Sequence, residues 1–357
     1  MLITRALYKE ILSWQAGLLV ILLFLALSQH ALKWLARALL GELPFEYVGK
    51  MILLEMPEVI GALLPFSFFL ALVLTFSRWS ADHEWTAVQS QGQGPDFWFW
   101  RALGLAGVQM VLICWILGWV APAFQLHRLQ LQTQAEAIVL TKTLKPGEFQ
   151  SFSQGVLYAE RKPQDTTFEN VFVAKMTPEG WQILSANKAV FIEDPTKGRL
   201  HLHLEEGRAI GFSTVSQTHT QMATFKEYQN FLNTETGTVA AGIKGYTLPE
   251  LWSASETSAP YEGAFRLSMA FGALVCVGWA LSFSNVKPRQ GRYARLLPAI
   301  VFLLVYLNTL SFLKRGLLQH HISAYGFLYF NVAICALGIA YFYYQQSGGR
   351  RGHPALS

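Results

Sequence analysis

Six long apolar stretches, three before about residue 125 and three after about residue 262, constrain this chain most. A helix needs roughly 20 mostly apolar residues to cross a hydrocarbon core of about 30 Å, and each stretch approaches that length. Hydrophobic residues make up 52% of the chain and charged residues only 14%, against about 25% charged residues in soluble domains. The sequence therefore predicts a membrane α-helical protein with six transmembrane helices, at residues 14–35, 56–77, 97–122, 264–285, 294–313 and 325–344.

Lys and Arg residues in the short loops predict how the chain is oriented, because such cations gather on the cytoplasmic side. With the N-terminus inside, that side receives Arg5, Lys9, Arg78, Arg101, Lys287, Arg289, Arg292, Arg295, Arg350 and Arg351. The opposite side receives Lys33, Arg37, Lys50, Lys314 and Arg315. Both termini are therefore expected in the cytoplasm, and the central block outside. The net charge of +5 mostly reflects this bias and predicts no nucleic-acid binding.

The central block, residues 125–262, has the pattern of an all-β domain. Short runs such as 156–159, 171–174 and 200–204 alternate apolar and polar residues, as strands with one buried face do. Pro, Gly and Asp separate these runs. About six to eight strands are expected, in a small sandwich or jelly roll. Residues 125–142 are predicted to extend the third span as a helix, and 248–252 to form a short amphipathic helix. The expected division is thus 1–124, 125–262 and 263–357.

Catalytic and metal-binding patterns are not recognisable in this sequence. Cys114, Cys276 and Cys335 all lie in apolar spans and suit small buried hydrophobes. The glycines of 237–245 lack the Gly-Lys-Ser/Thr ending of a phosphate-binding loop. His320 and His321 are adjacent but suit a solvated loop better than a metal site. We therefore expect a non-catalytic membrane subunit without a cofactor or metal, whose energy is supplied elsewhere.

Two cytoplasmic loops stand out from this background. Residues 78–92 have helical propensity up to Gly92 and place Glu84 beside Trp85. Such a short helix could dock into a groove of a soluble partner, or it could be a solvated turn at the interface. The second loop contains Pro288, Arg289, Gly291 and Arg292, which could contact anionic headgroups. Its Pro-Arg-Gln-Gly-Arg core is more specific than a charge bias requires.

These loops, together with three spans, an outer β-domain and three further spans, resemble the lipopolysaccharide export permeases, the paired F and G subunits of an ABC transporter. The likeness covers nearly the whole chain. It includes the basic-basic-acidic opening Arg5, Lys9 and Glu10, the residues Glu84, Ala87 and Gly92 of the first cytoplasmic loop, the segment 144–149, and Glu262 with Arg266 at the start of the fourth span. The loop at 288–292 resembles the F subunit more than the G subunit. The chain departs from the family at Trp85, at 93–95 and at Ala280.

The resemblance implies a function and a set of partners. The chain would extract lipopolysaccharide from the inner membrane of a Gram-negative bacterium and pass it to a periplasmic β-jelly-roll bridge toward the outer membrane. It would work with a homologous second permease (LptG-like), a cytoplasmic ATPase dimer (LptB-like) and a single-span periplasmic jelly-roll protein (LptC-like). Its central domain would lie in the periplasm.

The resemblance also implies roles for particular residues. Glu84, Trp85, Ala87 and Gly92 would couple the spans to the ATPase, with Glu84 holding an arginine of that partner. Lipopolysaccharide carries phosphates, and five candidate cations are expected at one membrane depth near the outer interface: His30, Lys33, Arg37, Lys314 and Arg315. The alternative for these cations is ordinary snorkelling to the interface.

Two other classes of function remain open from the residues. A membrane scaffold or assembly factor would bind a protein through its outer domain and would not depend on an ATPase. A lipid-modifying membrane enzyme would need paired catalytic groups at one depth, for which Glu55, Glu58 and His30 are the candidates.

Overall fold

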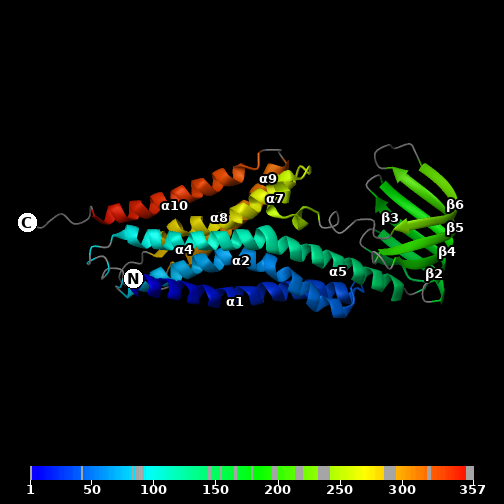
Figure 1. Cartoon of the computed structure of the whole chain (residues 1–357), viewed down its shortest axis with the longest axis horizontal. Helices are drawn as coiled ribbons and strands as arrows, with labels where there is room; N and C mark the ends of the chain where they lie inside the picture. Colours follow the sequence, from blue (N-terminus) through cyan, green and yellow to red (C-terminus); the bar gives the residue numbers. More distant parts are fainter. Residues whose placement is uncertain are drawn as a thin grey trace, which may run out of the picture. The chain divides into compact units, whose positions relative to one another are not determined.

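The computed structural model describes two compact units of the chain (Figure 1). The helical bundle comprises residues 1–28, 55–125 and 242–357, and the β unit comprises residues 29–54 and 126–241. Within these ranges the described residues are 2–41, 43–82, 84, 88, 90, 92, 94–142, 146–152, 155–164, 167–177, 180–194, 199–213, 220–231, 242–284, 295–319 and 323–350.

Helices account for most of the described residues outside the sheet. They are α1 (Leu2–Leu39), α2 (Phe45–Ala81), α4 (Pro95–Trp115), the π-helical turn η1 (Ile116–Val120), α5 (Ala121–Lys142), the 3-10 turn η2 (Gly242–Gly245), α7 (Leu248–Ser253), α8 (Ala259–Ser284), α9 (Leu296–Gln319) and α10 (Gly326–Arg350). The predicted helices at 125–142 and 248–252 are thus present, as parts of α5 and α7.

Six helical stretches among the described residues are long and apolar enough to cross a membrane, which confirms the predicted number. They are Ile3–Leu39, Phe45–Ala81, Asp96–Gln132, Ala259–Ser284, Leu296–Gly316 and Gly326–Gln346. The first three contain 37 residues each. At about 1.5 Å per residue each is about 55 Å long, which exceeds a hydrocarbon core of about 30 Å. These three helices therefore extend well beyond the apolar part of a bilayer.

Small residues let α8 pack closely against α10 in the bundle. A Cβ atom added to Gly278 would lie 2.8 Å from the carbonyl carbon of Gly338, and one added to Gly338 would lie 2.7 Å from the indole of Trp279. The Trp279 indole N–H donates to the carbonyl of Ile334 at 3.0 Å. Small residues at such positions allow close backbone approach between membrane helices, where packing rather than hydrophobicity drives association.

Aromatic side chains fill the core at the other helix contacts of the bundle. Trp98 of α4 is fully buried and packs edge-on against Trp79 and Phe76 of α2, at centroid distances of 5.2 and 6.2 Å. Leu7 and Ile11 of α1 belong to the same buried cluster. Large aromatic rings bury much area at each contact, so a few of them hold long helices in register.

The β unit contains a six-stranded antiparallel sheet in the described residues. Its strands pair in sequence order, β1 to β6. Figure 1 shows the labelled strands β2 to β6 together in this sheet. They are β1 (Gln150–Phe152), β2 (Gly155–Gln164), β3 (Thr167–Thr177), β4 (Gly180–Asp194), β5 (Arg199–Ser213) and β6 (Thr220–Phe231). The alternating runs predicted as strands all lie in these elements. In the same unit Trp34, Leu43, Met51 and Ala135 form a separate buried cluster between the ends of α1, α2 and α5.

A row of irregular residues crosses the sheet and changes which side chains face the core. Phe168 and Val171 of β3 are both buried, although strict alternation would place them on opposite faces. Asn170, which lies between them, has a φ of 51°, and Glu206 of β5 has a φ of 50°. Ala186 of β4 pairs with both Val171 and Gly207, so these two irregular residues lie in one row across the sheet. Such bulges bend strands.

The prediction of an inserted all-β domain is therefore confirmed, and six described strands agree with the expected number. A small sandwich or jelly roll was expected, and the described strands form one antiparallel sheet with a row of bulges. The reason is the connectivity: only two to six residues separate consecutive strands, so neighbours in sequence become neighbours in the sheet.

Candidate functional site

A group of paired charges near the start of α8 is the most chemically distinctive site of the bundle. The Glu262 carboxylate accepts a hydrogen bond from Arg266 Nε at 3.1 Å and another from Lys314 Nζ of α9. The side chains of Glu262 and Arg266 are 13% and 9% exposed, and that of Lys314 is 33% exposed. The Lys314 ammonium also lies 4.5 Å from the ring centre of Phe265. We call Glu262, Arg266, Lys314, Lys244 and Glu58 the Glu262 cluster.

The local sequence explains the first pair. Glu262 lies in the first turn of α8, and Arg266 follows four residues later. Residues four apart lie on the same helix face, and a carboxylate near a helix N-terminus is stabilised by the helix dipole. This pair is therefore preorganised by α8 itself.

Arg266 also connects α8 to two other parts of the bundle. Its guanidinium donates to the carbonyls of Tyr246 at 2.8 Å, Lys244 at 2.9 Å and Leu117 at 3.3 Å. Lys244 belongs to the 3-10 turn η2, and Tyr246 follows directly after that turn. Leu117 belongs to the π-helical turn η1. Four acceptors around one buried guanidinium satisfy most of its five donors.

The sequence of η1 explains why a helix carbonyl is available to Arg266. The N–H of Ala121 donates to the carbonyl of Ile116, five residues back. The next residue is Pro122, which has no N–H. The carbonyl of Leu117 therefore has neither of its usual helical donors, and Arg266 fills that position. π-Helical turns of this kind are frequently found at functional sites.

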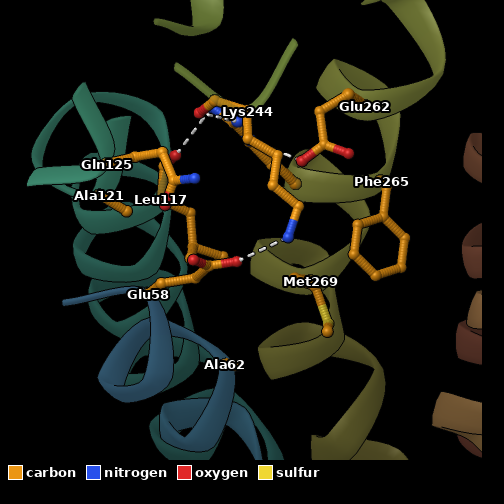
Figure 2. Close-up of a pocket in the computed structure, with 10 residues that line it drawn as sticks. Glu58, Ala62, Leu117, Ala121, Gln125, Lys244, Glu262, Phe265 and Met269 are labelled. Carbon is orange, nitrogen blue, oxygen red and sulfur yellow. Dashed lines mark hydrogen bonds and ion pairs between the residues drawn. The ribbon is translucent and has the colours of Figure 1, made fainter. Parts of the chain in front are cut away.

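A cavity of about 100 Å³ lies within the cluster (Figure 2). The Lys244 ammonium crosses toward Glu58 of α2, 3.4 Å away. Glu262, Arg266 and Gln125 also line the cavity, and the rest of the lining is apolar, with side chains from α2, the third span and α8. The lining residues other than the charged ones and Gln125 are Ala62, Leu117, Ala121, Phe265 and Met269.

The chemistry of this site is that of charge recognition. Three cations and two carboxylates give the cluster one net positive charge. Among the described residues no group of three or more His, Cys, Asp and Glu could hold a metal ion. Glu58 was a candidate catalytic residue of a lipid-modifying enzyme, and it forms an ion pair with Lys244. Glu55, the second candidate, is buried elsewhere in α2. The arrangement can bind or release an anionic group by exchanging partners within the cluster.

The predicted substrate cations are distributed over both units. Lys314 belongs to the Glu262 cluster, so it already has a carboxylate partner, while its neighbour Arg315 is exposed. His30, Lys33 and Arg37 belong to the β unit. Lys33 is exposed, and both Lys33 and Arg37 contact the face of the buried Trp34, at 5.9 and 5.1 Å from its ring centre. A common membrane depth for all five cations stays a prediction.

The predicted coupling loop is described in part. Glu84 has helical backbone and is exposed. Val88 is buried in the core of the bundle, and Gly92 is exposed with a φ of 83°. A glycine in this left-handed conformation commonly ends a helix, which agrees with the expected helix end. Trp85 and Ala87 lie outside the described residues.

The second loop motif also lies outside the described residues. Its residues are Pro288, Arg289, Gly291 and Arg292. Leu144 and Lys145, from the segment at 144–149 that resembles the family, also lie outside the described residues. Their roles stay predictions.

A network at the opposite end of the bundle was not anticipated from the sequence. Glu10 of α1 accepts hydrogen bonds from Arg78 at 2.6 Å and from the Trp79 indole at 2.8 Å. Arg101 of α4 donates to the Thr4 hydroxyl, and its carbonyl accepts from the Tyr8 hydroxyl at 3.2 Å. The basic-basic-acidic opening pointed to Glu10, but no sequence signal identified its partners.

The short helix α7, which leads toward α8, is capped by a titratable group. Glu250 accepts a hydrogen bond from the backbone N–H of Thr247 at 2.7 Å. Hydrogen bonds from the Thr247 backbone and side chain hold the pKa of the Glu250 carboxyl below its ordinary value. This reciprocal arrangement is a capping box, which defines where α7 begins.

Six helices long and apolar enough to cross a membrane, an inserted antiparallel sheet and a partly buried charge cluster define a polytopic membrane protein with a β-domain between its two groups of spans. The chain belongs to the lipopolysaccharide export system permease family LptF/LptG, whose model matches residues 5–344. It is similar to the lipopolysaccharide export system permease protein LptF of Escherichia coli strain K12 and of Shigella flexneri. Each is 25% identical over 326 residues, which cover 88% of this chain and 87% of the relative. The family predicted from the sequence is thereby confirmed.

Proposed function

We propose that this chain is the transmembrane permease subunit of an ABC transporter that extracts lipopolysaccharide from the bacterial inner membrane. It passes the lipid to a periplasmic β-jelly-roll bridge toward the outer membrane. Its partners are a homologous second permease, a cytoplasmic ATPase dimer and a single-span periplasmic jelly-roll protein, and ATP hydrolysis takes place in the ATPase. The observation that carries this proposal is the family match over residues 5–344, which includes both groups of spans and the inserted sheet.

The Glu262 cluster supports recognition of a phosphorylated lipid. Two of its cations and both of its carboxylates line a cavity whose other side chains, apart from Gln125, are apolar. Lys314, which pairs with Glu262, gives the whole cluster one net positive charge. A phosphate could replace Glu262 as the partner of Lys314, because charge-assisted hydrogen bonds to phosphate and to carboxylate are similar in geometry. Lys33 and Arg37 provide a second pair of cations, whose charged groups lie over the ring of Trp34. Such packing limits the side-chain entropy that binding would cost.

Glu84 is the residue that we assign to coupling. Its side chain is exposed, so a partner can reach it, while Val88 anchors the same segment in the bundle core. An arginine of the ATPase would pair with Glu84, and movement of the ATPase would then pull on the ends of α2 and α4. Truncating one partner of such a pair typically costs about 2–5 kcal/mol once the interface is formed.

The sheet of the β unit supports transfer of the lipid. Its two edge strands in the described residues, β1 and β6, each pair on one side only. A neighbouring jelly roll could extend the sheet at such an edge by strand addition. The apolar face formed by Leu157, Val173, Leu184 and their neighbours could then continue into the partner.

The competing function is that of a membrane scaffold or assembly factor, which would bind a protein through the same sheet edge without moving lipid. It predicts no dependence on an ATPase and no role for Lys33 or Arg37. The family match favours the transporter, because the family and its relatives are lipopolysaccharide export permeases.

The ATPase activity of the reconstituted complex tests the proposal. The native chain is compared with Glu84→Ala and with Lys33→Ala/Arg37→Ala, with and without lipopolysaccharide. Lys50→Ala, which removes an exposed cation from the same unit, is the matched control. We expect Glu84→Ala to abolish assembly or coupling, the double variant to change only the response to lipopolysaccharide, and Lys50→Ala to behave as the native chain. If no ATPase copurifies and no variant differs, the scaffold function replaces the transporter.

A further inference from the structure

A basic groove lies where the first and third spans begin. Its described lining consists of Thr4, Arg5, Tyr8, Lys9 and Leu12 of α1 and of Arg101 at the start of α4, and its volume is about 680 Å³. The groove is distinct from the Glu262 cluster, with which it shares no residue.

The cations of this groove are available to a ligand. Arg5 and Lys9 are exposed, and within the described part of the chain neither forms an ion pair with a carboxylate. Glu10, the acidic residue adjacent to Lys9, is already bonded to Arg78 and Trp79. Arg101 donates to the Thr4 hydroxyl and lies over the Phe97 ring at 4.5 Å, so its position is fixed by neutral partners.

Apolar surface continues from the groove along the helices. Leu12 of α1 is 46% exposed, and Val20, which lies on the same side of α1 as Lys9, is 66% exposed. Trp14 of α1 and Trp100, next to Arg101, are 40% and 64% exposed. Exposed Trp residues are enriched where membrane helices meet the headgroup region. Arg5, Lys9 and Arg101 are within about the first two turns of two membrane spans, on the side that the distribution of Lys and Arg predicts to be cytoplasmic. The groove therefore lies at headgroup level of the cytoplasmic leaflet.

We propose that this groove binds the headgroup of an anionic phospholipid from the cytoplasmic leaflet. The phosphate pairs with Arg5 and Lys9, Arg101 supplies the third positive charge, and the acyl chains lie along the exposed apolar surface beside Leu12. Basic pockets between membrane helices on this side of a bilayer are suited to such lipids. A soluble anion would meet the same charges but would leave the apolar surface uncovered.

The bound lipid would act on the loop that we assign to coupling. Thr4 and Tyr8 join α1 to α4 through Arg101, and Glu10 joins α1 to the end of α2. The loop from 82 to 94 connects these two helices. A lipid held against Arg5 and Lys9 would therefore stabilise the base of that loop. The binding itself does not depend on the proposed transport of lipopolysaccharide.

Native mass spectrometry of the purified, delipidated full chain tests the proposal. The chain is titrated with phosphatidylglycerol, with phosphatidylcholine and with inorganic phosphate. We expect phosphatidylglycerol to bind much more tightly than phosphatidylcholine. Arg5→Gln/Lys9→Gln should raise the Kd for phosphatidylglycerol by about 30-fold, which corresponds to about 1 kcal/mol for each cation near the membrane surface. Arg5→Lys/Lys9→Arg, which keeps both charges, should retain most of the affinity.

Arg295→Gln is the control, since it removes a cation on the same expected side but outside the groove, and should change the Kd by less than about twofold. The proposal fails if the double glutamine variant binds phosphatidylglycerol as the native chain does, or if Arg295→Gln has an equal effect. Inorganic phosphate that displaces the lipid at equal concentration would also overturn it, because the site would then recognise a simple anion. None of these outcomes depends on ATPase activity.

Discussion

Replacing Glu262 by glutamine tests whether the Glu262 cluster stabilises the bundle. The change keeps the size of the side chain but removes its charge, and it points an amide toward two cationic donors. Arg266, whose side chain is 9% exposed, loses its only carboxylate partner among the described residues. Lys314, which is 33% exposed, loses the same partner. The variant should therefore be less stable than the native chain.

The magnitude follows from the burial of each pair. Breaking a buried ion pair by removing one partner costs about 3–5 kcal/mol. Arg266 retains three carbonyl acceptors, so its share lies at the low end of that range. Lys314 is solvated, so its pair adds about 0–1 kcal/mol. Glu262→Gln should therefore lower the free energy of unfolding by about 3 kcal/mol.

Denaturant unfolding of the detergent-solubilised chain, followed by tryptophan fluorescence, measures this free energy. Glu256→Gln makes the same chemical change at an exposed position in the loop that precedes α8 and should cost less than about 0.5 kcal/mol. Lys314→Met alone should cost about 1 kcal/mol or less, and the loss in the double variant should be smaller than the sum of the two losses. If Glu262→Gln and Glu256→Gln are equally stable, the cluster contributes nothing to folding and the reasoning from burial is wrong.

Three further predictions follow from the close contacts and the capped helix. Gly278→Ala should lower the thermal stability of the bundle, because its Cβ would lie 2.8 Å from the backbone of α10, whereas Gly316→Ala meets nothing within 4 Å and should be neutral or stabilising. Gly207→Ala should destabilise the sheet by about 1–3 kcal/mol, because its Cβ would lie 2.4 Å from a backbone oxygen of β4, whereas Gly211→Ala, which has open space, should be nearly neutral; hydrogen exchange of the β-strand amides distinguishes them. The pKa of Glu250 is lower in the folded chain than its ordinary value of 4.5. Ionised Glu250 therefore stabilises the fold at pH values above 4.5, and this contribution is lost as the pH falls through the lower folded pKa. Glu250→Gln should therefore lose less thermal stability than the native chain between pH 5.5 and pH 3.5, and an equal loss in both would contradict the capping role.

The architecture was predictable because its signals are local. A membrane span reveals itself by about 20 consecutive apolar residues, and an exposed strand by alternation, so neither requires knowledge of distant residues. The six spans and the strands of the inserted domain were recognised in this way. The arrangement of the strands was less accessible. Alternation does not show which strands pair, nor that Asn170 and Glu206 lie in one row of bulges.

The contacts of the Glu262 cluster also differ in whether the sequence indicates them. The pair Glu262 and Arg266 follows from a spacing of four residues on one helix. Lys314, in contrast, was predicted to bind a phosphate of the substrate, and in the folded chain it pairs with the carboxylate of Glu262 from another helix. The sequence contains no signal for that partner, because 52 residues separate the two side chains.

The sequence by itself determined that the chain crosses a membrane six times, carries an inserted β-domain and belongs to the LptF/LptG family. These properties depend on composition, periodicity and short motifs, which survive without a specific three-dimensional arrangement. Tertiary structure alone decided that Arg266 reaches the carbonyl of Leu117 that Pro122 leaves without a helical donor, and that Lys244 reaches Glu58. Buried charges must find partners wherever packing brings donors and acceptors together, and that is a property of the folded chain rather than of any one segment.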